Sequence, residues 1–439
     1  MNLTQTHPPA LGIRPRKKIL SNGLTVVSVE MPHLHTIELS IMVRAGLRME
    51  TEATNGISHF LEHMLFRGNR HFENSIALSR EFETIGRDLR AATHSEYTSF
   101  GFSPHPPNLE RAMQLLALFF DGPTFPGLEL ERGIILEECL EDLNDEGANI
   151  NINNLACQLL YAGNPLSWPT IGTEQTIRAI TEADLKHYFE TWYHPSNMVL
   201  AGAGAIDGDR FESLAEQYFG GWSHKGRLIA KEGFGLVEKQ DAPRTLFQQD
   251  KDSQIQLQLC FRSRSYNHPD YFALSLISRM FDDGVCSRLQ KSLREDRGLV
   301  YSVECRATSW SDTGTFDFDV QVSPENAGQV TQILFEEVKT FLRDGPSQEE
   351  LDHVKNRYEF DLELDLDDPY KQIDRYAFPE LFSSPMPVEE ERERMRAVTL
   401  EECRRVAEET LAREKLNVIA VGPVTGALKQ EVQKQIDGF

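Results

Sequence analysis

The sequence predicts an α+β protein with two homologous domains, and three observations support this prediction. The chain has 439 residues, which is more than one core commonly holds, since domains run to about 100–200 residues. Its segments alternate between strand-like and helix-like hydrophobic patterns. The stretch 180–204, a capped helix followed by a turn at His194-Pro195 and an apolar strand, is matched in the same order by 398–424. Such an internal match indicates a duplicated unit of roughly 200 residues.

Two strands are expected near the start of the chain, and a third follows them. In 17–30 an Asn22-Gly23 signal separates two short extended segments and predicts a hairpin. Alternating apolar and more polar residues over 37–43 predict a half-buried strand, with Gly46 marking its end.

Helices are expected to follow these strands. The stretch 56–68 carries apolar residues at helical spacing, and Gly68 is expected to end this helix as a left-handed cap. Two further helices, 75–86 and 108–120, are predicted on either side of an extended segment, 91–104.

The domain boundary is predicted where the periodic patterns are interrupted. Glycines, lysines and a proline break them in 226–245, which is interpreted as a linker. The first domain is therefore expected over 1–225 and the second over 246–439.

Composition and charge exclude several classes of protein. Hydrophobic residues make up 40% of the chain and the formal net charge is -23, so we expect a folded protein that binds neither nucleic acid nor an anionic membrane. There is no run of about 18 apolar residues, and the N-terminal stretch has no secretory signal, so a cytoplasmic location is expected. Six cysteines without a C-x-x-C pair predict buried thiols: Cys139, Cys157, Cys260, Cys286, Cys305 and Cys403.

The helix predicted over 56–68 holds the pattern H-x-x-E-H, formed by His59, Glu62 and His63. Residues four apart lie one turn apart on a helix, so the two imidazoles can bind one metal ion while the carboxylate reaches a water on that metal. The alternative is a helix with two histidines that are satisfied by ordinary hydrogen bonds. The apolar setting favours a metal, because burying these groups without a partner costs several kcal/mol.

A third metal ligand is expected on a second helix, since a catalytic zinc commonly has three protein ligands. In 128–143, Glu131 and Glu138 share a predicted face with Ile134 and Ile135. We interpret Glu138 as the ligand and Glu131 as a carboxylate that orients a ligating imidazole. A charge that favours the start of the helix is an equally good interpretation of Glu131.

Five segments together resemble the pitrilysin, insulinase and mitochondrial processing peptidase family of zinc metallopeptidases, the inverzincins, in its short bacterial two-domain form. The resemblance covers nearly the whole chain, and the segments occur in the family's order and approximate spacing: LSNGLTVV, GISHFLEHMLFRG, ERGIILEE, YHPSNMVLAGAG and REDRGLVYSV.

The resemblance implies a fold and a set of site residues. Each domain would be a mainly antiparallel sheet packed with helices. His59, His63 and Glu138 would bind one zinc ion per chain, and Glu131 would match the family's buried accessory glutamate. Glu62 would be the general base of a zinc metalloendopeptidase, taking a proton from water and returning it to the leaving amine.

The resemblance also implies that the second domain contributes to catalysis. Arg294 and Tyr301 match the family's Arg and Tyr, spaced by seven, and both can donate hydrogen bonds to a developing oxyanion. Because the family encloses its substrate between four such domains, this chain is expected to form a dimer in which the two residues serve the partner's zinc. A homodimer is sufficient, and a heterodimer with a homologous subunit remains an alternative.

One segment departs from the family's pattern. The family usually has Asn-Ala-x-Thr on the strand that pairs with extended substrate, whereas this chain has Arg90, Ala91, Ala92 and Thr93, followed by Glu96. Pairing through the main chain would survive this change. We therefore expect these residues to bind substrate with an altered preference.

Two functional alternatives accompany the endopeptidase that cleaves peptides or unfolded segments. One is a peptidase dedicated to a single precursor peptide, and the other is a non-catalytic subunit that binds peptide. The acidic runs 136–146 and 361–368 are either solvated faces or surfaces that attract cationic peptides.

Overall fold

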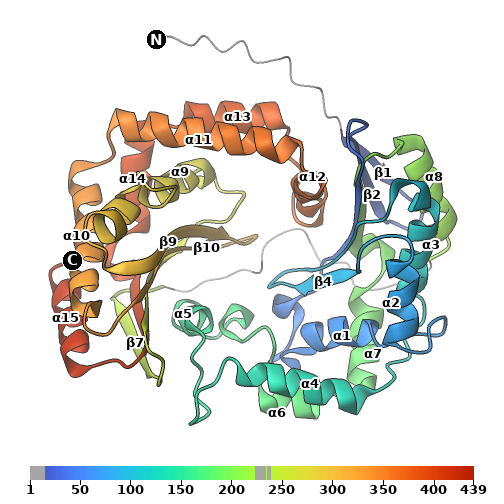
Figure 1. Ribbon diagram of the computed structural model, residues 1–439, viewed down its shortest axis with the longest axis horizontal. Coiled ribbons are helices and arrows are strands. Elements are labelled where there is room, and N and C mark those ends of the chain that lie inside the picture. The colour runs from blue at the N-terminus through green and yellow to red at the C-terminus, as the bar shows by residue number, and fades with distance from the viewer. Residues whose placement is uncertain (1–14, 223–233, 235–238) are drawn as a thin grey trace. The chain divides into compact units, whose positions relative to one another are not determined.

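The chain folds into two compact units, each assembled from three segments (Figure 1). The computed structural model describes residues 15–222, 234 and 239–439. The first unit contains Met1–Leu136, Thr170–Lys231 and Leu362–Met386, and the second contains Glu137–Pro169, Glu232–Asp361 and Pro387–Phe439. Continuous domains were expected from the sequence, whereas each half of the chain here supplies a segment to the other unit. The expected linker, 226–245, lies mostly outside the described residues.

The first unit is built on a six-stranded sheet in the order β1-β2-β6-β3-β5-β4. β2 and β6 are parallel, and every other pair of neighbours is antiparallel. The predicted hairpin joins β1 to β2, with Gly23 at a φ of 93°. The strands are Pro15–Ile19 (β1), Thr25–Glu30 (β2), Ile37–Val43 (β3), Arg90–Thr93 (β4), Thr98–Phe102 (β5) and Met198–Gly204 (β6).

Helices cover both faces of this sheet. α8 contacts β2 and α1 contacts β4, whereas α12 packs on β2, β3 and β6. The two helices predicted around the extended segment are confirmed as α2 and α3. The helices are Ile57–Leu65 (α1), Ser75–Glu83 (α2), Leu109–Phe119 (α3), Leu128–Leu140 (α4), Glu174–Ala179 (α6), Glu182–Trp192 (α7), Gly208–Phe219 (α8) and Pro369–Tyr376 (α12). The end of α4, from Glu137 on, is assigned to the second unit.

The second unit is built on a five-stranded sheet in the order β7-β11-β8-β10-β9. β7 and β11 are parallel and the other neighbours are antiparallel. The strands are Arg244–Gln249 (β7), Ile255–Ser263 (β8), Val300–Ser309 (β9), Gly314–Val322 (β10) and Leu416–Gly422 (β11). The helices are Ile152–Leu160 (α5), Tyr271–Phe281 (α9), Ala327–Asp344 (α10), Gln348–Leu366 (α11), Val388–Ala397 (α13), Leu400–Thr410 (α14) and Gly426–Asp437 (α15).

The two sheets repeat one topology, which confirms the predicted duplication. β2, β6, β3, β5 and β4 of the first sheet occupy the places of β7, β11, β8, β10 and β9 in the second. The matched segments 180–204 and 398–424 form α7 with β6 and α14 with β11, respectively. The expected mainly antiparallel sheets packed with helices are therefore present in both units.

A helix from the opposite half of the chain covers each sheet. α5 packs on β7, β8 and β11, and α12 packs on the equivalent strands β2, β3 and β6. In the second unit, Leu155 and Leu160 of α5 belong to one buried cluster with Cys260, Ile419 and Val421. We call this arrangement the helix exchange.

The helix exchange explains why β3 departs from its predicted burial. All seven residues of this strand are buried, including Glu38 and Ser40, although a half-buried strand was predicted. The polar face of the strand lies under α12 rather than in solvent. The alternation of residues within β3 cannot show that a helix more than 300 residues later in the chain covers this strand.

Helix α1 also ends differently from the prediction. It stops at Leu65, and Phe66 is a right-handed C-cap, so Gly68 lies beyond the helix end. Gly68 has a φ of 130°, and a Cβ there would lie 2.6 Å from the carbonyl oxygen of Phe72. The glycine is therefore needed for the turn that follows the helix, not for its cap.

Two further expectations concern cysteines and membranes. All six cysteines are free, and four of them are buried as expected for packing thiols. Cys157 is partly buried, and the expectation is wrong for Cys286, which is exposed. Within the described part of the chain, no helix has both the length and the apolar character needed to cross a membrane.

Candidate metal centre

Helix α1 is anchored at its start before it presents any metal ligand. Gly56, the N-cap, has a φ of 92°, and a Cβ there would lie 2.4 Å from a backbone oxygen of Ile171. The buried carboxylate of Glu50 accepts hydrogen bonds from the backbone N–H groups of Gly56, at 2.7 Å, and Ser58, at 3.0 Å. Glu50 thereby satisfies two of the N–H groups that a helix start leaves without partners.

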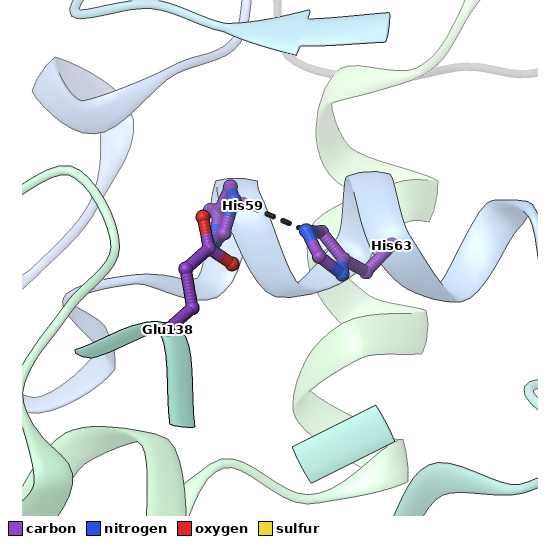
Figure 2. Close-up of side chains that lie close together, drawn as sticks. All are labelled: His59, His63 and Glu138. Atoms are coloured by element: carbon purple, nitrogen blue, oxygen red, sulfur yellow. Dashed lines mark hydrogen bonds between the residues drawn. The ribbon is translucent and has the colours of Figure 1, made fainter. Parts of the chain in front are cut away.

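His59 and His63 lie one turn apart on α1 and converge with Glu138 of α4 (Figure 2). Their Nε2 atoms are 3.2 Å apart. The three residues each offer a ligand atom, and these atoms all lie within 4.8 Å of one another. The structure thus brings together the three residues that the sequence predicted as metal ligands.

This donor set fits a zinc ion. Zinc–nitrogen bonds of about 2.0–2.1 Å in a tetrahedron place neighbouring donors about 3.3 Å apart. The two histidine nitrogens already have this separation. Two imidazoles and one carboxylate, with a fourth position left for water or substrate, are a combination that catalytic zinc sites use.

Burial keeps one of the two candidate ligating imidazoles neutral. It lowers the pKa of His59 from 6.5 to about 3, and the charge of His63 adds to this effect. The ring therefore remains unprotonated at neutral pH and below it, until the pH approaches about 3. A neutral imidazole is the form that binds a metal.

Glu131 orients the other ligating imidazole. Its Oε1 lies 2.8 Å from Nδ1 of His63, which leaves Nε2 directed towards His59. The second oxygen of Glu131 lies 3.1 Å from Nε of Arg67, so the carboxylate bridges two side chains at the end of α1. These contacts support the orienting interpretation of Glu131 over a charge that serves only the start of its own helix.

Helix α4 holds both glutamates because it continues without a break from Glu131 to Glu138. Arg132 ties it to the first unit through the carbonyl oxygen of Ile177, and its guanidinium lies 5.3 Å from the ring centroid of Phe60. The prediction that Ile134 and Ile135 share one apolar face of this helix is only partly correct.

Of the two isoleucines predicted on that face, Ile135 is fully buried, whereas 45% of Ile134 is exposed. Adjacent residues on a helix are about 100° apart, so one lies inward and the other outward.

Glu62 is held by the edge strand of the first sheet. Thr93 Oγ1 on β4 donates a hydrogen bond to Glu62 Oε2 at 2.5 Å. The edge strand that was predicted to bind substrate is therefore in direct contact with the predicted general base. β4 ends the sheet, so its outer edge pairs with no other strand of the described chain.

Other predicted substrate residues have distinct surroundings. Ala91 and Ala92 lie on β4 with Arg90, whose guanidinium binds Glu38. Glu96 is buried and forms an ion pair with Arg48 at 2.8 Å. Its predicted contact with substrate stays a prediction.

Arg294 and Tyr301 lie in the second unit. Arg294 is in a short π-helical segment, Gln290–Glu295, and its side chain is 51% exposed. Tyr301 follows Val300 at the start of β9, the edge strand of the second sheet, and is 82% exposed. Both side chains are open to solvent, as donors for a bound substrate must be.

Two residues of the centre were missed in the sequence. Arg67 lies four residues after His63, so helical spacing would have placed it near the same carboxylate. No sequence spacing pointed to Glu50, because its contact with the start of α1 depends on the path of the turn between them.

An H-x-x-E-H helix joined by a glutamate from a second helix defines an inverzincin type of metal centre. Residues 25–174 match the family described as insulinase (peptidase family M16). Residues 179–358 match a second domain of that family, described as the peptidase M16 inactive domain. The chain belongs to this family of zinc metallopeptidases.

Similar proteins carry corresponding names. An uncharacterized zinc protease of Mycobacterium bovis is 28% identical, with 94% of each chain covered. The zinc protease YmxG of Bacillus subtilis is 28% identical, covering 82% of this chain and 86% of its own. A probable mitochondrial-processing peptidase subunit beta of Schizosaccharomyces pombe is 26% identical over 93% of this chain and 91% of its own.

Solved structures show the same fold. A protease from Helicobacter pylori has a TM-score of 0.86 at 21% identity and covers 94% of this chain and 100% of its own. The periplasmic protease PqqL from Escherichia coli has a TM-score of 0.78 at 21% identity, covering 96% of this chain and 50% of its own. The fold of both units is thus shared with the Helicobacter pylori protease and with about half of the PqqL chain.

Proposed function

We propose that this chain is a zinc-dependent endopeptidase that cleaves peptides or unfolded segments. The convergence of His59, His63 and Glu138, with Glu62 beside them, is the observation that carries this proposal. A zinc ion bound there would polarise the scissile carbonyl and lower the pKa of water. The names of the related zinc proteases support the same activity.

The residues of the chain have separate tasks in this reaction. Glu62 takes a proton from water and returns it to the leaving amine, and the hydrogen bond from Thr93 keeps its carboxylate aimed. Extended substrate pairs with the outer edge of β4. Arg294 and Tyr301 donate hydrogen bonds to the carbonyl oxygen as it gains charge.

Replacing Glu62 tests the activity. Glu62→Gln keeps the shape of the side chain but cannot accept the proton, so we expect it to retain close to one zinc per chain and to lose peptide cleavage by at least about 100-fold. Metal analysis and digestion of an unbiased peptide pool measure the two properties. Cleavage that continues in a zinc-free Glu62→Gln protein would refute the proposal.

We also propose that the active form is a dimer in which Arg294 and Tyr301 act at the partner's metal centre. Sedimentation should then show a particle of twice 50.0 kDa. Mixing Glu62→Gln chains with Tyr301→Phe chains should restore part of the activity that each variant has lost. A fully active monomer would remove this role.

A second candidate is a processing peptidase that works with a sister subunit on one precursor. The similarity to a protein named as the beta subunit of a processing peptidase favours it. Purification of the chain from its native cell would reveal such a subunit as a stoichiometric partner.

A further inference from the structure

A cavity of about 270 Å³ lies in the first unit, on the face of the sheet opposite α1. Arg90, Ala92, Tyr97 and Ser99 line it from the edge strands, and Tyr370 and Asp374 line it from α12. This volume is just below the range of small-molecule sites, about 300–1,000 Å³, and suits one amino-acid side chain. The helix exchange creates the cavity, because α12 comes from the second half of the sequence.

The position of the cavity relates it to the edge strand. Side chains of a strand alternate between the two faces of a sheet. Thr93 points towards Glu62 on the α1 face, whereas Arg90 binds Glu38 on the opposite face. A peptide paired with β4 would therefore direct one side chain towards the metal centre and the next towards the cavity.

The charges around the cavity do not cancel. Arg90 Nη2 lies 2.7 Å from Glu38 Oε1, so the positive charge of Arg90 already has a partner. Asp374 is half-buried and forms no hydrogen bond or ion pair within the described part of the chain. Its carboxylate is thus the charged group in the wall that has no direct partner, although the charge of Lys371 acts on it.

Nearby groups favour a cation beside Asp374. Burial raises the pKa of Asp374 to about 6, and the acidic groups Asp368 and Asp365 add to this rise while Lys371 opposes it. The carboxyl is still mainly ionised at neutral pH, and its pKa would fall if a cation entered the cavity.

The aromatic walls complete the site. Burial, followed by the nearby Asp374, raises the pKa of Tyr97, so its phenol stays neutral. Tyr97 and Tyr370 both line the cavity, and the Tyr97 ring is stacked on His94. An aromatic ring beside a bound cation adds to its attraction.

We propose that this cavity is a specificity pocket for a lysine or arginine side chain of the substrate, with Asp374 as its counter-ion and Tyr97 and Tyr370 beside it. The proposal rests on the proposed peptidase function and adds a substrate class to it. It also gives a role to Asp374, which lies just beyond the acidic run 361–368. Arg90, which departs from the family's pattern, is paired with Glu38 at the wall of the cavity.

Matched peptides test the pocket. One position at a time in a cleaved peptide would carry lysine or norleucine, which has a similar length and no charge. At one position we expect the full-length enzyme to favour lysine at least tenfold in kcat/KM. Asp374→Asn should remove this preference through KM while leaving cleavage of the norleucine peptide within about twofold.

A control variant makes the outcome decisive. Asp367→Asn removes a charge from the acidic run, and because the side chain is 82% exposed, this variant should keep the preference. A preference that survives in Asp374→Asn, or an equal loss with both peptides, would overturn the proposal.

A measurement of peptide affinity tests the specificity pocket separately from the proposed peptidase activity. Fluorescence anisotropy with full-length Glu62→Gln chains reports peptide affinity without cleavage. A lysine preference that depends on Asp374 would support the pocket even if the wild-type chain cleaves no peptide. Equal binding of the two peptides by an enzyme that does cleave them would refute the pocket alone.

Discussion

At the scale of single residues, the metal centre depends on side chains that contact the ligands as much as on the ligands themselves. Glu131 contacts both His63 and Arg67, and Thr93 contacts Glu62. These contacts fix the directions of an imidazole and a carboxylate before any substrate arrives. Because these directions are already fixed, binding a metal or a substrate costs less entropy.

Glu131→Gln should weaken zinc binding. The amide can still contact His63 but carries no charge, so the imidazole is held less firmly and becomes a weaker ligand. We expect an affinity loss of about 10–100-fold, measured by competition with a chromophoric chelator. Glu129→Gln is the matched control, because this glutamate is on the same helix with an 80% exposed side chain. Equal zinc affinities for the two variants would contradict the orienting role.

The sequence identified the ligands more readily than their surroundings. His59, Glu62 and His63 follow from helical spacing, and Glu138 follows from the need for a third ligand. Thr93 was predicted to bind substrate, but its contact with Glu62 depends on how β4 lies against α1. Sequence spacing describes neighbours within one element and not those between elements.

At the scale of elements, the start of α1 determines where the histidines lie. The helix has only nine residues, a length at which an isolated helix is marginal in water. Its stability must come from packing and from the hydrogen bonds at its start. Glu50 supplies the latter from outside the helix.

Glu50→Ala should loosen this helix. The change leaves the N–H groups of Gly56 and Ser58 buried without an acceptor, at a cost of about 1–3 kcal/mol each. We expect a loss of about 2–6 kcal/mol in the free energy of unfolding and weaker zinc binding.

Urea unfolding and amide exchange of α1 measure these effects. Glu52→Ala, which removes an exposed carboxylate two residues later, should change neither property. Unchanged exchange at Ser58 in Glu50→Ala would show that the cap is not needed.

Element positions were predicted well wherever the signal is local. The β1–β2 hairpin, α2, α3 and the repeated pairs α7–β6 and α14–β11 all appear where expected. The burial of β3 was not predicted, because it depends on α12. Local patterns fix the type of an element, and distant segments decide how much of it is covered.

At the scale of the whole molecule, the helix exchange makes the two halves of the sequence interdependent. Within α12, Gln372, Ile373 and Tyr376 are buried in the first unit. Just after it, Glu380 accepts a hydrogen bond from Lys17 at 2.6 Å. Full burial of a large apolar side chain contributes about 1.5–3 kcal/mol, so losing this segment would remove a large part of a stability that is typically about 5–15 kcal/mol.

The fragment 1–225 should therefore fail to fold by itself. We expect it to lack a cooperative thermal transition and to bind a dye that reports exposed apolar surface. Joining residues 362–386 to it through a flexible linker should restore the transition. A fragment that melts cooperatively without this addition, at the temperature of the full chain, would contradict the dependence on α12.

The helix exchange also has a consequence for synthesis on the ribosome. The chain emerges from its N-terminus, so the first sheet and the metal-binding helix are made long before α12 leaves the ribosome. One face of that sheet therefore stays without α12 until about five-sixths of the protein has been translated. A nascent chain would thus complete the unit that holds the candidate metal centre only near the end of translation, so the proposed peptidase could act only when the polypeptide is almost finished.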